Sequence, residues 1–214
     1  MLTNDSVIEV FDDCFSVDIA KTIERNLEIK DHLGYGWTYG HTAQKDNPDK
    51  QPFWMIDISS NPEHYKVFQG YSDEIFNALK EKLNFLERFN VESYQRVYMN
   101  GHTYGQVPNV HRDDGQITMI YQPKVTWKRE WGGGTSFYYQ ESGEETHEHF
   151  TPKALDKYKT VDYIGNRLIV FDADILHGAD PIDRQCYNLR TVMVWKCFFK
   201  DGTGRDRLDY YAGR

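Results

Sequence analysis

The stretch Asn109-Val110-His111-Arg112-Asp113-Asp114-Gly115 decides how the rest of the chain is interpreted. His111 and Asp113 are two residues apart, and the Asp114-Gly115 pair that follows is typical of a turn. Side chains repeat every two residues along a strand, so on a strand entering that turn both would point the same way. An imidazole and a carboxylate on one face form two-thirds of a 2-His-1-carboxylate metal site. Because His-x-Asp occurs by chance in many chains, the hypothesis requires a second histidine.

The composition favours a single ordered domain spanning residues 1–214, long enough to bury a sizeable core. The net charge of −8 opposes a general phosphate-binding surface, so nucleic acid is a disfavoured partner. The sequence has no signal-peptide pattern and no apolar segment of transmembrane length. Three cysteines without metal spacing predict reduced thiols, and we expect a cytoplasmic protein with no membrane partner. The oligomeric state is not indicated.

The first 90 residues are expected to supply helical support. Ile19, Ile23 and Leu27 recur at helical spacing, and Pro62 stands where a first helical residue often is a proline. We therefore predict strands at 7–11 and 53–58 and helices over 17–30 and from 61 to about 89.

Two loops are candidates for contact with a substrate. Residues 34–52 form a long polar stretch that contains Trp37, Tyr39 and His41, with room for a short strand. Long ordered loops are often lids or binding loops, so a substrate lid and a simple surface excursion both stay open. Lys124–Glu130 is either a second substrate-facing loop or, as we favour, a solvated connection.

From Glu92 onward the pattern changes to short strands and turns, with a turn expected at Asn100-Gly101. Many short strands after two helices predict a mostly β fold, a double-sheet jelly roll or barrel over about 91–200 with helical support. The strands are expected at 93–99, 116–121, 135–139, 147–150, 160–164, 166–173 and 189–199.

The second histidine is found beyond the strand predicted at 166–173. His177 stands there among turn residues, and the order His-x-Asp then His makes it a candidate third ligand. Arg190, at the start of the last strand, has a guanidinium that can bind a carboxylate through two parallel hydrogen bonds. A salt bridge to an acidic residue is the alternative role, and Arg184 is a competing anchor in a polar turn.

These pieces occur in an order that resembles the 2-oxoglutarate/Fe(II)-dependent dioxygenases, especially their prolyl 4-hydroxylase-like branch. The resemblance covers roughly residues 93–200, and the opening segment Val10–Ser16 is also similar to the start of the family. The ordered set is far more specific than any single piece. It consists of Val97-Tyr98, His111-Arg112-Asp113, Ile117–Tyr121, Gly132-Gly133-Gly134-Thr135, Arg167–Phe171, His177 and Arg190.

The resemblance implies a double-stranded β-helix (cupin-like jelly roll) in which Fe(II) is held by His111, Asp113 and His177. It also implies that 2-oxoglutarate chelates the iron and pairs its far carboxylate with Arg190. Tyr98 matches a family tyrosine that hydrogen-bonds this cosubstrate. Two weaker candidates for the same pocket are Thr118 and Tyr121, of which Tyr121 is more simply explained as core packing.

The activity implied is an O2-dependent hydroxylation of a C–H bond, with succinate and CO2 as coproducts. A peptidyl proline or another protein side chain is the leading substrate. A nucleic-acid demethylase and a small-molecule hydroxylase of the same chemistry are alternatives, as is a non-catalytic cupin-like metal-binding module.

Two features depart from the pattern of the family. The segment between Tyr98 and His111 is a few residues longer than usual, and Arg190 stands closer to Trp195 than expected. The second feature predicts a bulge in the last strand.

Overall fold

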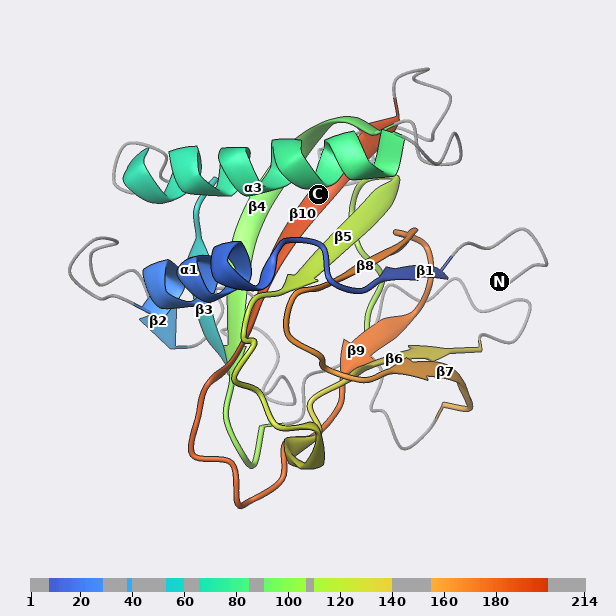
Figure 1. Cartoon of the computed structure of the whole chain (residues 1–214). Coiled ribbons are helices and arrows are strands. Elements are labelled where there is room, and N and C mark those ends of the chain that lie inside the picture. The colour runs from blue at the N-terminus through green and yellow to red at the C-terminus, as the bar shows by residue number, and fades with distance from the viewer. Residues whose placement is uncertain are drawn as a thin grey trace.

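Figure 1 presents the computed structural model, which describes residues 8–28, 38–39, 53–59, 66–84, 91–106, 110–139 and 155–199. Two antiparallel sheets and two long helices make up this part of the chain, so the fold is rich in β-structure as expected. None of the helices described is long and apolar enough to cross a membrane.

The larger sheet has seven strands in the order β1-β8-β5-β10-β4-β3-β2, and the smaller has three in the order β7-β6-β9. Strands far apart in the chain are therefore neighbours, which brings the segments around His111 and His177 together. The larger sheet contains β1 (Ile8–Phe11), β2 (Thr38–Tyr39), β3 (Trp54–Asp57), β4 (Val91–His102), β5 (Ile117–Gln122), β8 (Arg167–Asp172) and β10 (Arg190–Phe199). The smaller contains β6 (Thr135–Tyr138), β7 (Lys157–Val161) and β9 (His177–Ala179), and a short 3-10 helix, η2 (Arg129–Trp131), precedes β6.

Helices α1 (Val17–Glu28) and α3 (Lys66–Asn84) cover one face of the larger sheet, here called the outer face (Figure 1). Residues at helical spacing on both helices pack against alternate residues of the strands, because a strand directs every second side chain to the same face. The resulting core includes Ile23, Leu27, Phe68, Ile75, Leu79, Leu83, Met99, Met119, Tyr121, Leu168, Val170, Met193 and Trp195.

The opposite face of the larger sheet, here called the inner face, turns toward the smaller sheet. Phe137 on β6 and Val161 on β7 pack there against Ile120, Phe171 and Val194 of the larger sheet. Charged and polar side chains also stand on this face, and they belong to the candidate site described below.

Most predicted elements are confirmed, with shifts of a few residues at their ends. The bulge expected in the last strand is present as a register shift between Lys196 and Cys197 where β10 pairs with β4. The strand expected at 160–164 is β7, at Lys157–Val161. The short strand β2 was allowed for, whereas β9 was not predicted. The strand predicted at 147–150 and most of the loop at 34–52 lie outside the described residues.

The turn predicted at Asn100-Gly101 is wrong. Both residues lie inside β4, and Gly101 pairs with Thr191 of β10 on one side and with Trp54 of β3 on the other. Because β4 is paired on both sides, its backbone hydrogen bonds outweigh the local turn preference of an Asn-Gly pair.

The segment Lys124–Glu130 is the expected solvated connection in part, because Thr126 and Lys128–Glu130 are exposed, whereas Lys124 and Trp127 are buried. Lys124 is buried and forms an ion pair with Glu28 of α1, and Thr126 donates a hydrogen bond to Glu24 of the same helix. Trp127 is 8% exposed, and its Nε1 donates to the carbonyl of Gly132 at 3.0 Å. The segment therefore ties α1 to the glycine run before β6.

Candidate metal centre

The two candidate histidines are placed by a backbone bridge. The N–H of His111 donates to the carbonyl of His177 at 2.9 Å, and the N–H of His177 donates back at 3.0 Å. Residues that exchange both hydrogen bonds in an antiparallel pair direct their side chains to the same face. The two imidazole centroids lie 4.6 Å apart as a result.

Asp113 completes the cluster from the turn after His111. Its backbone N–H donates to Ala173 at 3.0 Å, which fixes the turn against the end of β8. Carboxylate Oδ1 lies 3.3 Å from Nε2 of His111, and Oδ2 lies 3.3 Å from Nε2 of His177. One ligand atom from each of the three residues fits within 4.8 Å, so the predicted ligands do converge.

The hydrogen bonds of His177 prepare it for a metal. Its Nδ1 lies 2.9 Å from the carbonyl of Ile175, and because a carbonyl only accepts, Nδ1 carries the proton and Nε2 presents a lone pair. Burial lowers the pKa of His177 against the opposing effect of Asp113, so the neutral ring is favoured. Phe171 packs on this ring at a centroid distance of 4.6 Å and shields it.

Lys196 is a member of the site that the sequence reasoning missed. The side chain is 2% exposed and its ammonium forms an ion pair with Oδ2 of Asp113. Burial alone would raise the pKa of Asp113, but the positive charge of Lys196 outweighs it and holds that pKa well below its usual range. The sequence does contain a pattern that points to Lys196. Lys196 and Arg190 are six positions apart on the same strand, and an even spacing places both side chains on one face of the sheet.

Arg190 lies further along the inner face, with 1% of its surface exposed. Its guanidinium donates to the carbonyls of Gly133 and Gly134 and lies 5.4 Å from the ring centroid of Tyr163. Gly133 has a φ of 74°, and a Cβ there would lie 3.0 Å from Cδ of Arg190. Among the described residues, no carboxylate forms an ion pair with Arg190. Asp180 is the carboxylate that influences the pKa of Arg190, and its ion-pair partner is Lys157.

His102 stands beside Arg190 and has one nitrogen without a partner. Arg190 lies 3.4 Å from Nδ1 of His102, and because a guanidinium only donates, the neutral ring has its proton on Nε2. Burial and the charge of Arg190 hold the pKa of His102 well below its usual value, which keeps the ring neutral. Nε2–H is buried without an acceptor among the described residues. A buried cation beside an unpartnered donor fits a carboxylate ligand.

The remaining predicted contacts are divided between the two faces. Tyr98 lies on the inner face with its ring 5.4 Å from Nζ of Lys196, and burial raises its pKa to about 12. Thr118 donates from Oγ1 to Oδ2 of Asp113 at 2.6 Å and therefore orients a ligand. Tyr121 lies on the outer face, where it packs edge-on against Phe15, which excludes the predicted pocket contact. Arg184 is exposed.

The chain is similar to known proteins in structure but not in sequence. No family model matches the chain, and no curated protein matches it in sequence. Solved structures do match. A prolyl 4-hydroxylase from Pseudomonas putida is similar with a TM-score of 0.58 and 14% identity, covering 90% of this chain and 94% of that one. The chain has the fold of the prolyl 4-hydroxylases.

Two further solved structures support the same fold. A prolyl hydroxylase from Trichoplax adhaerens, in complex with a hypoxia inducible factor peptide fragment, matches with a TM-score of 0.58 and 14% identity over 94% of this chain and 89% of that one. A viral collagen prolyl hydroxylase from Paramecium Bursaria Chlorella virus-1, solved as a 2OG complex, matches with a TM-score of 0.54 and 17% identity over 91% and 98%.

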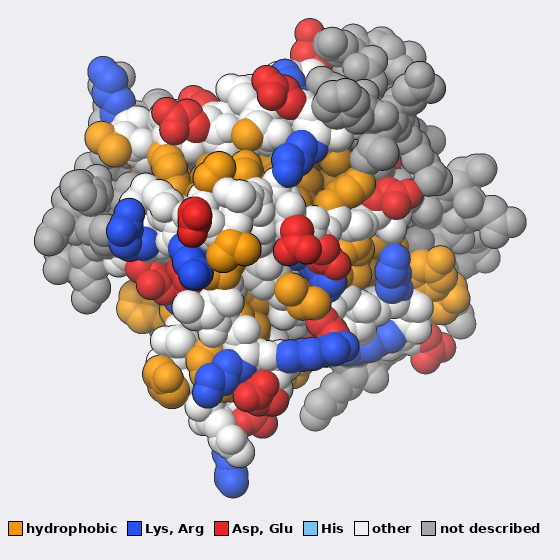
Figure 2. Space-filling model, in the orientation of Figure 1, with side chains coloured by type: hydrophobic (Ala, Val, Ile, Leu, Met, Phe, Trp, Pro, Cys, Tyr) orange, Lys and Arg blue, Asp and Glu red, His pale blue; other side chains and the backbone are white. Residues whose placement is uncertain are grey.

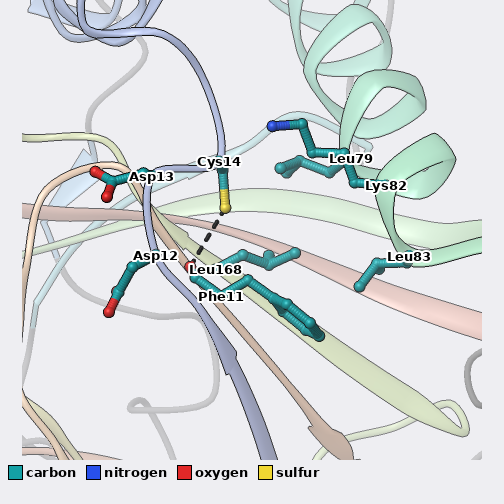
Figure 3. Close-up of a pocket in the computed structure, with 8 residues that line it drawn as sticks. All are labelled: Phe11, Asp12, Asp13, Cys14, Leu79, Lys82, Leu83 and Leu168. Carbon is teal, nitrogen blue, oxygen red and sulfur yellow. Dashed lines mark hydrogen bonds between the residues drawn. The ribbon is translucent and has the colours of Figure 1, made fainter. Parts of the chain in front are cut away.

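A small pocket on the outer face offers no comparable chemistry (Figure 3). The thiol of Cys14 points there toward the carbonyl of Phe11, 3.4 Å away. Burial raises the pKa of Cys14 to about 11, so the thiol stays protonated and unreactive. This pocket is lined by Phe11, Asp12, Asp13, Cys14, Leu79, Lys82, Leu83 and Leu168.

The molecular face drawn in Figure 2 carries basic and acidic side chains interspersed. Among the described residues of this view, no broad area of one sign is visible. A surface that tracks a nucleic-acid backbone has clustered lysine and arginine, so this face does not have the pattern of a phosphate-binding surface.

Proposed function

We propose that the chain is a 2-oxoglutarate- and Fe(II)-dependent oxygenase that uses O2 to hydroxylate a C–H bond. The observation that carries the proposal is the convergence of half-buried His111 with buried Asp113 and His177, with the tautomer of His177 set for metal binding. Two histidines and one carboxylate are the ligand set of non-haem Fe(II) oxygenases. The prolyl 4-hydroxylase fold of the solved relatives supports the same class.

Different residues of the site would bind the metal and the cosubstrate. Nε2 of each histidine and one oxygen of Asp113 would hold the metal, while Thr118 orients the carboxylate. Arg190 and Nε2–H of His102 would bind the far carboxylate of 2-oxoglutarate, because both are buried and neither has an anionic partner within the part of the chain that the structure describes. When bound, Fe(II), 2-oxoglutarate and O2 supply the oxidising power, with succinate and CO2 as coproducts. Phe171 and Phe137 exclude water around His177.

We also propose that the chain folds as a double-stranded β-helix in a single catalytic domain. The two antiparallel sheets, with the ligand set between their facing sides, support this architecture. The helical layer on the outer face would then serve as support, as the sequence predicts for residues 1–90.

The proposed substrate is a peptide or protein side chain, and proline is the leading target. Support comes from the solved relatives, which include prolyl hydroxylases and one complex with a peptide fragment. The role of residues 34–52 as a substrate lid stays a prediction, as does a cytoplasmic location.

The function is tested by adding Fe(II) and 2-oxoglutarate to the protein without oxygen and recording the visible charge-transfer band of their chelate. We expect the band in the wild type and its loss in His177→Ala, which lacks one metal ligand. His147→Ala is the matched control, because it removes a histidine that the proposal does not use, and it should keep the band. Well-folded wild-type protein without a band would overturn the oxygenase proposal and leave a metal-binding module.

The substrate class needs its own measurement. Succinate release should rise when proline-containing peptides are added to the iron-loaded protein, and the peptide should gain one oxygen atom by mass spectrometry. Stimulation by methylated nucleic acid or by small molecules, with none by peptides, would contradict the peptide substrate while leaving the oxygenase chemistry in place.

A further inference from the structure

Lys196 is a buried cation that the roles described above do not require. The residue is 1% exposed, and its ammonium forms an ion pair with a carboxylate that is itself a candidate metal ligand. A lysine is almost never fully buried without a specific partner. A second positive charge beside a cation site opposes the metal, so its presence calls for a physical explanation.

The contacts of Asp113 show what the lysine does to the carboxylate. Oδ2 accepts from Oγ1 of Thr118 at 2.6 Å and also contacts the ammonium of Lys196. Thr118 and Lys196 therefore both contact Oδ2, which also lies 3.3 Å from Nε2 of His177, whereas Oδ1 lies 3.3 Å from Nε2 of His111. Asp113 is therefore arranged to offer a single oxygen to a metal, and the position of Lys196 helps to select that oxygen.

The other groups near Lys196 leave its charge largely in place. Its neighbour on β4 is Arg96, whose charge is paired with Asp57 at 3.3 Å. The ring of Tyr98 lies 5.4 Å from the ammonium, and neither its phenol nor the imidazole of His177 supplies a negative charge that would cancel the charge of Lys196. An ammonium has three N–H donors, and among the described residues its ion-pair partner is Asp113.

The charges of the loaded site follow from these contacts. A divalent metal and Asp113 together carry one net positive charge, and Lys196 raises that charge to two. Because 2-oxoglutarate is a dianion, the additional charge attracts it, whereas the same charge repels the metal.

We propose that Lys196 is a positioning residue of the function proposed above, which limits Asp113 to one metal-binding oxygen and sets the charge of the site. It strengthens the binding of the dianionic cosubstrate and weakens the binding of the metal. Replacing Lys196 should therefore move the two affinities in opposite directions. A lysine that only fills space would not have this effect, because a packing defect weakens both.

The experiment is a pair of calorimetric titrations on the full chain, first with Mn²⁺ alone and then with 2-oxoglutarate on the Mn²⁺-loaded protein. In Lys196→Met we expect Mn²⁺ to bind about tenfold more tightly and 2-oxoglutarate about tenfold more weakly, since charges a few ångströms apart interact strongly in a buried site. Lys196→Gln is a second neutral variant, in case Met does not fold. Lys159→Met, which removes a charge from the exposed strand β7, should change neither affinity.

The outcomes separate the two proposals. Unchanged or weaker Mn²⁺ binding in folded Lys196→Met or Lys196→Gln overturns the role of Lys196. If the wild type binds Mn²⁺ but no 2-oxoglutarate, the proposed function fails, and the Mn²⁺ titration alone then decides for or against Lys196. Lys196→Arg retains the charge, so 2-oxoglutarate affinity closer to wild type than in the neutral variants is expected. Equal loss in Arg and Met would contradict a charge effect.

Discussion

The two faces of the larger sheet are built from alternate residues of the same strands. The outer face packs against the helices, and the inner face carries the candidate site. On β10, Trp195 is fully buried against the helices, whereas its neighbour Lys196 is buried beside Asp113 on the inner face. On β5, Tyr121 packs on the outer face and Thr118 orients the carboxylate on the inner face. On β10 the core residue Trp195 and the site residue Lys196 are thus adjacent in the sequence.

The difference between the faces is one of charge rather than of burial. The outer face is covered by apolar side chains of α1 and α3, so its contribution is mainly to stability. The inner face holds the charges of Asp113, Arg190 and Lys196 in a buried environment, where each needs a partner. We therefore expect changes on the outer face to affect folding and changes on the inner face to affect ligand binding.

The largest effect is expected from Asp113→Ala. The variant loses a metal ligand, so metal binding should become undetectable by calorimetry. It also leaves Lys196 as an uncompensated buried charge, which costs roughly 3–5 kcal/mol of unfolding free energy. The double variant Asp113→Ala with Lys196→Met should recover most of that stability in urea unfolding without recovering metal binding. A double variant as unstable as the single one would contradict the pairing.

Trp195→Ala tests the outer face at the adjacent position. The side chain is fully buried and packs near Phe76, at a ring-centroid distance of 6.1 Å, so its removal should cost about 3–5 kcal/mol in urea unfolding. The folded protein should keep the metal affinity of the wild type. Trp195→Phe retains most of the volume and should cost less. A folded Trp195→Ala protein that had lost metal affinity would break the division between the faces.

Parity along the strands explains how much of the site the sequence predicts. The three metal-ligand candidates come from local patterns, and the structure brings all three together. Thr118 and Tyr121 are three positions apart on one strand, so they cannot line the same pocket, and alternation alone was sufficient to exclude Tyr121. Lys196 lies an even number of positions from Arg190 and so points to the same face. The sequence alone does not single it out, because a lysine in a strand is normally expected to face solvent.

Long-range pairing explains what the sequence does not predict. Strand β9 has three residues in a turn-rich segment, and it is a strand because it pairs with β6, some forty residues earlier in the chain. The Asn100-Gly101 pair has a strong local turn preference, and two neighbouring strands override it. In both cases the deciding hydrogen bonds join distant segments, so no local pattern reports them.

Arg190→Leu tests the far end of the inner face. Losing one partner of a buried charge pair costs roughly 2–5 kcal/mol, so 2-oxoglutarate affinity should fall on the order of 100-fold. Metal affinity should not change, because Arg190 is not among the ligand set. Calorimetric titration with Mn²⁺ measures the metal affinity, and titration of the Mn²⁺-loaded protein with 2-oxoglutarate measures the cosubstrate affinity. Arg184→Leu is the matched control on an exposed residue, and a loss of cosubstrate affinity there instead would move the anchor to Arg184.

The smallest effect is expected for the ion pair between Arg167 and Asp12, in which the carboxylate is exposed. Arg167 binds both carboxylate oxygens of Asp12, whose side chain is 53% exposed, and this hydrogen bonding holds the pKa of Asp12 below its usual value. A lowered folded pKa means that the stabilisation is present above the unfolded pKa of about 3.9 and is lost as the pH falls through the folded value. Asp12→Asn should therefore cost less than about 1 kcal/mol at pH 6, because solvent screens the pair.

Thermal unfolding of Asp12→Asn and wild type between pH 6 and pH 3 measures this difference. The gap should narrow as the pH falls and Asp12 becomes protonated, since the protonated acid and the amide are both neutral. It should also shrink in high salt, which screens exposed charges more than buried ones. A gap of the same size at pH 6 and at pH 3 would show that the substituted amide disturbs packing, and the contrast between exposed and buried charge pairs would then rest on Asp113 and Lys196 alone.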